Sequence, residues 1–486
     1  GARRGGGRAP STRAGGRVER LADELALLAV VACLAVYGLS NPDRPNLYNH
    51  FVWQAAAWLE GEVAIPYPVE ATADSPGNAF FQDVMPIAEP TGEEPGRALV
   101  PFPPFPAVVL LPFVAVFGMA TNAQLIASVV GALDVGLAVW VLGRLGVRPP
   151  VRLATVVFFG LGTVLWAAAM DGETWYFAHV VAVGLTLLSI GTAIGGDPDA
   201  RAEALAATAA VLPTRLPLGG GEADVGAARA GSGLRLPAID RRQAVAGFLL
   251  GLAATARLPV AFGLPFLALV GSGGGWLGRT ISAAAGAAIP LALLGGYNLL
   301  STGHLFHPAY AYLHEIEVGF YPLLFPYLEY HPEWGMEDPR YLLQNLRLML
   351  LAGPLVLPPC PPGATRGLFD PACPLIVPRD DGLSLLLTSP GYLLALPALR
   401  ALRTSRLVAG AALAIGAVAV VNLMHFSQGW VQFGYRFSND FAPFALLLVA
   451  LGVERLGGVR RLVVALVGAS VVVNLWGVVW ANLLGW

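Results

Sequence analysis

The stretch AVAGFLLGLAATARLPVAFGLPFLALV, residues 244–270, decides how the rest of the chain is threaded. It is long enough to cross a bilayer once as a single helix. It also contains Arg257, Leu258 and Pro259 near its middle, where two short helices could turn back on each other. The two alternatives place every later loop on opposite sides of a membrane, so the distribution of charge has to choose between them.

The composition around this stretch is that of a membrane protein. Of the 486 residues, 56% are hydrophobic and 13% are charged, and the mean hydropathy is +0.63. Such a chain has too little polar side-chain surface for a water-soluble domain. We therefore expect an all-α polytopic membrane protein. Apolar runs that reach or approach the length of a bilayer crossing occupy residues 21–40, 121–143, 151–170, 174–195, 281–300, 383–399, 407–424, 441–453 and 462–483.

The arginines choose between the two alternatives for 244–270. All 30 basic residues are Arg, and Arg accumulates in cytoplasmic loops. With the N-terminus inside and 244–270 folded as a re-entrant pair, 22 of the 30 fall on the cytoplasmic side. A single span would send the clusters at 400–406 and 455–461 outward. We therefore predict about eleven transmembrane helices in a bacterial cytoplasmic membrane, with the C-terminus outside.

This topology divides the chain into six parts. Residues 21–40 are expected to be a retained span, because the run lacks the small-residue cleavage site of a signal peptide. The glycine-rich part of the cytoplasmic loop has no phosphate-binding motif and is expected to be flexible. The parts are a cytoplasmic Arg/Gly-rich tail (1–20), an N-terminal transmembrane module (21–195) with an external loop (41–120), a flexible cytoplasmic loop (196–243), the re-entrant pair and a span (244–300), a second external loop (301–382) and the C-terminal helices (383–486).

The two long external loops hold further local signals. Residues 51–60 have an amphipathic helical pattern, and the proline-rich start of 101–118 favours an interfacial helix over a clean crossing. Cys360 and Cys373 lie thirteen residues apart in the second loop. Outside the cytoplasm they are expected to form a disulfide; the alternative is two unrelated thiols.

Acidic residues at the external boundary are the first candidates for chemistry. Asp43 directly follows the first span, where burial by neighbouring loops would raise its pKa towards that of a general base; the alternative is an ordinary turn aspartate. Asp171 and Glu173 form a second acidic turn that could bind a divalent cation or a sugar hydroxyl, or could simply be solvated. Asp134 falls inside the second span, where a carboxylate is costly, and it favours a transporter.

Two arginines lie at the same boundary. Arg257 and Arg436 could bind a lipid-linked phosphate, because guanidinium matches phosphate oxygens bidentately. Alternatively, they snorkel to the interface, and Arg436 pairs within a helix with Asp440 four residues later. The net charge of −2 predicts no nucleic-acid partner.

The order of these motifs resembles the polyprenyl-phosphate-dependent GT-C glycosyltransferases, the class that contains the aminoarabinose transferases and protein O-mannosyltransferases. The matching segments are listed in chain order. They are Asp43 with Tyr48, Trp58-Leu59-Glu60-Gly61, Pro103-Pro104 closing with Phe117-Gly118, Asp171, Gly251-Leu252-Ala253 followed by Arg257, and Tyr297-Asn298-Leu299 followed by Gly303.

The resemblance implies an inverting transfer of a sugar from a polyprenyl-phosphate donor to an acceptor on the external face, with Asp43 as the general base. Acceptor binding would fall to Tyr48, Asn49, His50, Asp171, Glu173 and His179. Donor and phosphate binding would fall to Arg257, Tyr297, Asn298, Tyr310, Tyr435 and Arg436. Many relatives have Asp-Glu in the first loop, whereas Asp43 precedes Arg44, so a metal held by Asp43 and Asp171 stays open.

Two other functions stay open beside this one. A transporter or flippase of a lipid-linked saccharide would share the aromatic residues, the arginines and the intramembrane acid without needing Asp43. A non-catalytic scaffold of the same fold would bind a partner enzyme. The sugar, the acceptor and the oligomeric state are not determined by the sequence.

Overall fold

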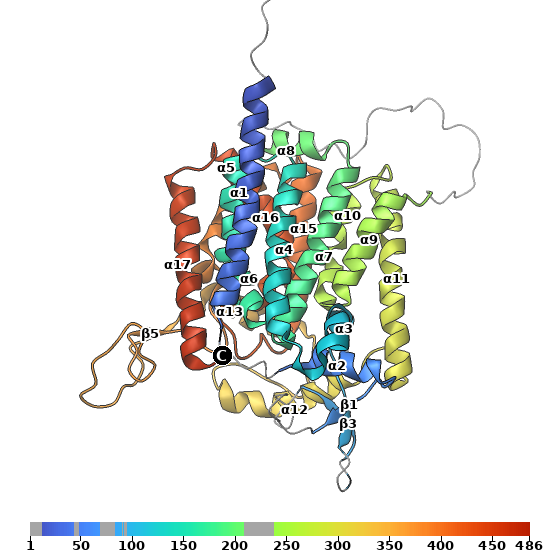
Figure 1. Ribbon diagram of the computed structural model, residues 1–486, viewed down its shortest axis with the longest axis vertical. Coiled ribbons are helices and arrows are strands. Elements are labelled where there is room, and N and C mark those ends of the chain that lie inside the picture. The colour runs from blue at the N-terminus through green and yellow to red at the C-terminus, as the bar shows by residue number, and fades with distance from the viewer. Residues whose placement is uncertain (1–11, 43–47, 69–82, 90, 92–94, 209–237) are drawn as a thin grey trace, which may run out of the picture.

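A computed structural model describes residues 12–42, 48–68, 83–89, 91, 95–208 and 238–486. Upright helices form a bundle, and short strands and further helices gather at one end of it (Figure 1). The upright helices are α1 (Thr12–Leu39), α4 (Ala123–Arg144), α5 (Pro149–Leu161), α6 (Leu165–Asp171), α7 (Thr174–Gly196), α9 (Arg241–Ala254), α10 (Leu264–Leu269), α11 (Trp276–Thr302), α15 (Arg406–Met424), α16 (Ala442–Arg455) and α17 (Arg461–Leu484).

We call the end that carries the strands the loop end, and the opposite end the arginine end. The elements at the loop end include α2 (His50–Leu59), β1 (Ile65–Tyr67), β2 (Met85–Ala88), β3 (Gly96–Leu99), α3 (Phe105–Phe117), η1 (Gly118–Ala120) and α12 (Ala309–Leu324). The arginine end carries α8 (Ala200–Thr208). The remaining elements are η2 (Leu258–Gly263), η3 (Pro339–Tyr341), α13 (Leu342–Leu351), β4 (Leu355–Val356), β5 (Ile376–Val377), α14 (Leu385–Thr388), η4 (Pro390–Ala395), η5 (Ala398–Ala401) and η6 (Arg436–Asp440).

Five helices, α4, α7, α11, α15 and α17, are long and apolar enough to cross a membrane. The pair α5 and α6 makes a sixth candidate if its two helices form one span. This count covers only the described residues. The chain is therefore a predominantly helical, membrane-embedded protein, but the expected number of eleven spans is not confirmed.

Two of the expected spans are broken rather than continuous. The run 151–170 forms α5 and α6, which are bent by 51° at the break. The run 383–399 forms α14, η4 and η5 instead of one helix. Pro390 and Pro397 remove backbone donors inside this apolar run, so a continuous helix would leave carbonyl groups unpaired.

Residues 244–270 fold back on themselves. The Gln243 side chain at the start of α9 donates to the carbonyl oxygens of Leu267 (2.6 Å) and Val270 (3.1 Å) at the end of α10. The two ends of the segment therefore meet, and the chain reverses its direction near Arg257. In addition, the Phe105 amide of α3 donates to the Thr255 carbonyl, so the first loop packs on this turn.

Residues 200–208 of the loop that is expected to be flexible form helix α8. The buried Arg406 guanidinium is 2.6 Å from the Glu203 carboxylate of α8 and 3.4 Å from Asp197. An ion pair with a buried arginine holds the helix against α15. Helix α1 likewise begins at Thr12, inside the expected tail.

The loop end is built on a three-stranded antiparallel sheet of order β1-β3-β2. The expected helix 51–60 is α2, but it is buried on nearly all sides, since α3 and the sheet cover it. In the second loop Cys360 and Cys373 form a disulfide. Strand β4 precedes Cys360 and strand β5 follows Cys373, and the two strands pair with each other.

Glycines let α9 and α11 approach closely. A Cβ at Gly247 would collide with the Ala283 carbonyl of α11, and a Cβ at Gly286 would collide with the Ala244 carbonyl of α9. Small residues are the usual means of close packing between helices in membranes, because lipid-embedded helices associate through contact area.

We expect Gly286→Ala to lower the free energy of unfolding by about 1–3 kcal/mol, because the new methyl group meets backbone atoms that cannot move aside. Thermal unfolding of the purified protein in detergent measures the change. The matched control is Gly296→Ala on the same helix, where a Cβ would meet nothing within 4 Å. Equal effects of the two variants would contradict the close contact.

Candidate functional site

The Asp440 carboxylate joins four segments at the loop end. Its Oδ1 lies 2.7 Å from His179 Nδ1 and 3.2 Å from Arg257 Nε. Its Oδ2 accepts from Arg257 Nη2 at 3.0 Å and from Asn422 Nδ2 at 3.1 Å. We call these four residues the Asp440 cluster. It ties together α7, the turn after α9, α15 and η6.

The charge of Asp440 is compensated inside the protein. Burial alone would raise the pKa of this fully buried carboxyl group, but the Arg257 guanidinium and the His179 imidazole outweigh it and hold the pKa well below its usual range. The alternative of an ion pair between Arg436 and Asp440 within one helix is wrong, because the partner of Asp440 is Arg257.

Arg436 is buried beside this cluster, with a relative exposure of 7%. Its Nε and Nη1 have no hydrogen-bond partner among the described residues. The guanidinium carbon lies 5.5 Å from the Tyr176 ring centre and 5.6 Å from that of Phe437. Arg257 reaches the same Phe437 ring at 5.1 Å. Both arginines thus lie around one aromatic side chain, and of the two it is Arg436 that has buried donors without a partner in the residues that the structure describes.

The room for Arg436 depends on Gly429. This glycine has a φ of 97°, and a Cβ there would lie 2.7 Å from the Arg436 guanidinium. A positive φ is accessible to glycine at little cost, whereas other residues rarely adopt it. The loop before η6 therefore places bare backbone against the guanidinium.

A pair of carboxyl groups, Asp83 and Glu317, lies near Arg436. Asp83 precedes β2 and accepts a hydrogen bond from the Trp175 indole at 2.8 Å, and a hydrogen bond links it to Glu317 of α12. Burial and the facing Asp83 carboxyl group raise the pKa of Glu317 to about 8, and the Arg436 guanidinium opposes this rise. Burial also raises the pKa of Asp83. At neutral pH Glu317 therefore keeps its proton.

The turn between α6 and α7 connects this pair with the first loop. The Thr174 amide donates to the Tyr48 carbonyl at 3.2 Å, and the Thr174 hydroxyl lies 2.6 Å from His50 Nδ1. The Asp171 carboxylate accepts from the Glu173 amide at 3.2 Å. The Trp175 ring lies beside that of Tyr48 at a tilt of 55°, with ring centres 5.0 Å apart. The turn therefore anchors the chain that leads into α2.

The structure brings some of the expected site residues together and separates others. Arg257 and His179 belong to the Asp440 cluster, and Arg436, Tyr310 and Tyr435 lie beside it. Tyr48, Asn49, His50, Asp171 and Glu173 gather at the turn between α6 and α7. Asp43 lies outside the described residues.

Two expected donor-binding residues have structural contacts of their own. The Tyr297 hydroxyl accepts from Gln54 of α2 at 2.9 Å. Asn298 donates to the Leu305 carbonyl at 2.9 Å and so closes the turn that follows α11. Neither contact is to the Asp440 cluster. His179, expected to bind the acceptor, is fully buried with its Nδ1 directed at Asp440.

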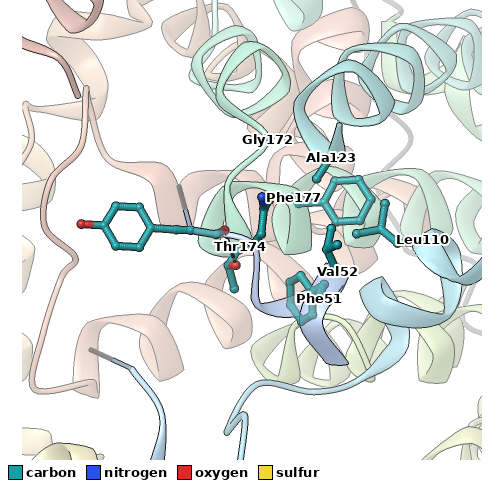
Figure 2. Close-up of a pocket in the computed structure, with 9 residues that line it drawn as sticks. Phe51, Val52, Leu110, Ala123, Gly172, Thr174 and Phe177 are labelled. Carbon is teal, nitrogen blue, oxygen red and sulfur yellow. Dashed lines mark hydrogen bonds between the residues drawn. The ribbon is translucent and has the colours of Figure 1, made fainter. Parts of the chain in front are cut away.

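A small crevice opens beside the turn between α6 and α7, where α2, α3, α4 and α7 meet. Figure 2 shows its apolar walls. The lining residues are Tyr48, Asn49, Phe51, Val52, Leu110, Ala123, Gly172, Thr174 and Phe177. Arg257 and Arg436 do not line it, so this crevice and the arginines are separate features.

A metal centre is not formed by the described part of the chain. Within those residues, no three His, Cys, Asp or Glu side chains are grouped so that they could hold an ion. The expected pair of Asp43 and Asp171 is not testable there, because Asp43 is outside the described residues.

Sequence reasoning missed the residues that complete the site. Asp83, Tyr176 and Glu317 were not candidates, and Asp440 was considered only as a local partner of Arg436. The Trp175-Tyr176 pair directly after the acidic turn was a usable signal. No sequence signal indicated the pairing of Asp83 with Glu317, because the two residues belong to different loops.

Comparison of the chain with protein-family models, with curated proteins and with solved structures finds no match.

Asp440→Asn should lower the free energy of unfolding by about 3–5 kcal/mol, because it leaves the half-buried Arg257 without its counter-ion. Chemical unfolding in detergent micelles measures this loss. The control is Glu62→Gln, which removes the exposed ion pair with Arg97 and should cost about 0–1 kcal/mol. If both variants lose the same small amount, the Asp440 cluster does not hold the four segments together.

We expect the contact between Asp83 and Glu317 to weaken at alkaline pH. A carboxyl group with a raised pKa stabilises the folded contact fully below its ordinary pKa, and this contribution is lost as the pH rises through the raised value, about 8 for Glu317. Above that pH Glu317 is ionised and can no longer donate a proton to the facing Asp83 carboxyl group. We expect hydrogen exchange in α12, corrected for the intrinsic rate, to accelerate as the pH passes this value.

Glu317→Gln tests the origin of that change. The amide can still donate to Asp83 but does not titrate, so the acceleration should disappear in this variant. The same pH dependence in both proteins would assign it to other groups.

Proposed function

We propose that the chain is a membrane glycosyltransferase of the GT-C type, which transfers a sugar from a polyprenyl-phosphate donor to an acceptor at the loop end. The observation that carries the proposal is Arg436, a buried guanidinium beside a second arginine, with two nitrogens that have no partner within the described part of the chain. Phosphate oxygens are the acceptors that fit such donors best, since guanidinium and phosphate pair bidentately.

The sidedness of the proposal rests on the other arginines. Side chains such as Arg144, Arg148, Arg242 and Arg406 lie where α7, α8 and α16 meet the arginine end. By the positive-inside rule this end faces the cytoplasm. The loop end then faces the outside of a bacterial cytoplasmic membrane, where the phosphate of a polyprenyl donor would lie at the level of Arg436.

In the proposed reaction, Asp43 accepts the proton of the acceptor hydroxyl group. The acceptor oxygen attacks the anomeric carbon, the bond from that carbon to the phosphate oxygen breaks, and the configuration inverts. Arg436 stabilises the charge that develops on the leaving phosphate. Arg257 contributes less directly, because two of its nitrogens are already bound to Asp440.

The proposed roles of the other acceptor-binding and donor-binding residues follow from where these residues lie in the structure. Tyr48, Asn49, Asp171 and Glu173 would bind the acceptor at the turn between α6 and α7, close to the chain on either side of Asp43. Tyr310 and Tyr435 would flank the donor phosphate beside Arg257. Tyr297 and Asn298 would act only through the packing of α2 and the end of α11. A divalent cation is not required by this mechanism.

We expect Arg436→Gln to weaken the binding of polyprenyl phosphate by about tenfold to a hundredfold, the loss of one charge-assisted hydrogen-bonded contact of about 1.5–3 kcal/mol. Native mass spectrometry of the purified protein with added polyprenyl phosphate measures the binding. Arg436→Lys should restore part of it, because the charge remains and the bidentate geometry does not. A matched control is Arg366→Gln in the second loop, which should bind normally.

Asp43→Asn separates the base from the phosphate site. This variant should bind polyprenyl phosphate normally but lose transfer of radiolabelled sugar from a panel of polyprenyl-phosphate sugars to cell-envelope acceptors. Normal transfer by Asp43→Asn would remove the general base, and normal binding by Arg436→Gln would remove the phosphate site.

The second candidate is a transporter or flippase of a lipid-linked saccharide, favoured by Asp134. This buried carboxyl group lies in α4 against Gly184 of α7, and its Oδ2 has no partner among the described residues. Intramembrane acids often mark transport pathways. Loss of labelled-lipid movement across proteoliposomes in Asp134→Asn, with no effect of Asp43→Asn, would favour this function.

A further inference from the structure

An apolar hairpin extends sideways from the bundle. It comprises residues 353–378, which we call the lateral hairpin, and Figure 1 shows it passing beyond α17 at the level where that helix ends. Six large apolar side chains on it are exposed. Exposed apolar side chains gathered in this way are uncommon on a surface that faces water. The six are Leu355, Val356, Leu357, Leu368, Phe369 and Leu375, with relative exposures of 41–65%.

The lateral hairpin is rigid. The Cys360–Cys373 disulfide closes its tip, and β4 pairs with β5 at its base. Between them, the Leu357 amide donates to the Leu375 carbonyl and the Leu375 amide to the Gly367 carbonyl, both at 2.9 Å. The exposed apolar side chains are therefore held outward and cannot collapse on one another.

Charge is scarce on this surface. Arg366 and Asp370 are the ionisable side chains of residues 353–378, and both are used internally. The Arg366 guanidinium donates to the Pro374 carbonyl at 2.8 Å, and the Asp370 carboxylate accepts from the Ala372 amide at 2.9 Å. A surface with so few charges suits the membrane interface, where apolar side chains enter the leaflet and charged groups stay at the level of the headgroups.

The depth of the hairpin identifies that environment. The Phe369 ring centre lies 6.3 Å from that of Trp480 on α17. Trp480 lies four residues before the end of α17 at Leu484, which is about 6 Å along the helix axis. Since α17 is a candidate membrane span, Phe369 lies at the level of its last turns, where the headgroups meet the acyl chains.

Continuity with α17 supports the same conclusion. This helix exposes Val472, Leu475 and Leu483, and only 33% of its apolar window is buried within the protein. The lateral hairpin prolongs this lipid-facing surface in the plane of the membrane.

We propose that the lateral hairpin is an interfacial anchor that inserts its apolar side chains into the lipid leaflet at the loop end. The occupant of the surface is lipid. The anchor fixes the second loop, and with it α13 and the chain that leads to α14, at a constant depth relative to the bundle.

Site-specific photo-crosslinking in lipid tests this. The full-length protein carries a photoreactive phenylalanine analogue in place of Leu368 and is reconstituted into nanodiscs of phosphatidylethanolamine and phosphatidylglycerol. We expect lipid adducts, detected as added lipid mass by intact-protein mass spectrometry, in several-fold higher yield than with the same analogue in place of Glu333. Glu333 belongs to the same loop and is exposed without apolar neighbours on the hairpin.

Equal adduct yields at the two positions would overturn the proposal, as would crosslinked dimers from position 368, which would make a second copy the occupant. A further variant guards against chance lipid contact. With the analogue in place of Val356, Leu368→Asp should lower the adduct yield several-fold, because a carboxylate is expelled from the acyl region, whereas Leu368→Ala should lower it less. An unchanged yield in Leu368→Asp would also refute the anchor.

Discussion

The loop end of this protein depends on one buried carboxylate. Asp440 accepts hydrogen bonds from Arg257, His179 and Asn422, and so connects three helical segments that are distant in the sequence. An isolated ion of this kind would be costly to remove from water. The bond to Arg257 is therefore a constraint on the whole bundle: α7, α15 and the turn after α9 can pack only where their donors reach the same two oxygens.

This constraint also gives Arg257 and Arg436 different roles. Because Asp440 occupies Arg257, the guanidinium nitrogens without a partner among the described residues belong to Arg436, which lies near the Asp83–Glu317 carboxyl pair. Phe437 contacts both guanidinium groups. The arrangement separates an arginine that holds the fold from one that can bind an anion, which is the basis of the proposed phosphate site.

Much of the helical architecture could be predicted from apolar run length alone, and the places where prediction failed have physical causes. Run length cannot detect the break at Pro390, because apolar character persists across it while the backbone donor is lost. The helix around Glu203 was missed because its stability comes from the distant Arg406. At the site, spacing suggested the local pair of Arg436 with Asp440, whereas packing selected Arg257 as the partner of Asp440.

The amino-acid sequence alone predicts a helical, membrane-embedded chain, because burial of apolar side chains and satisfaction of backbone hydrogen bonds depend on composition and run length. It also singled out Arg257 and Arg436 as unusual residues. Only the tertiary structure decided which carboxylate neutralises which arginine, and that Asp83 meets Glu317. Such contacts join residues far apart in the chain, and their energies depend on distance and burial, which sequence spacing does not encode.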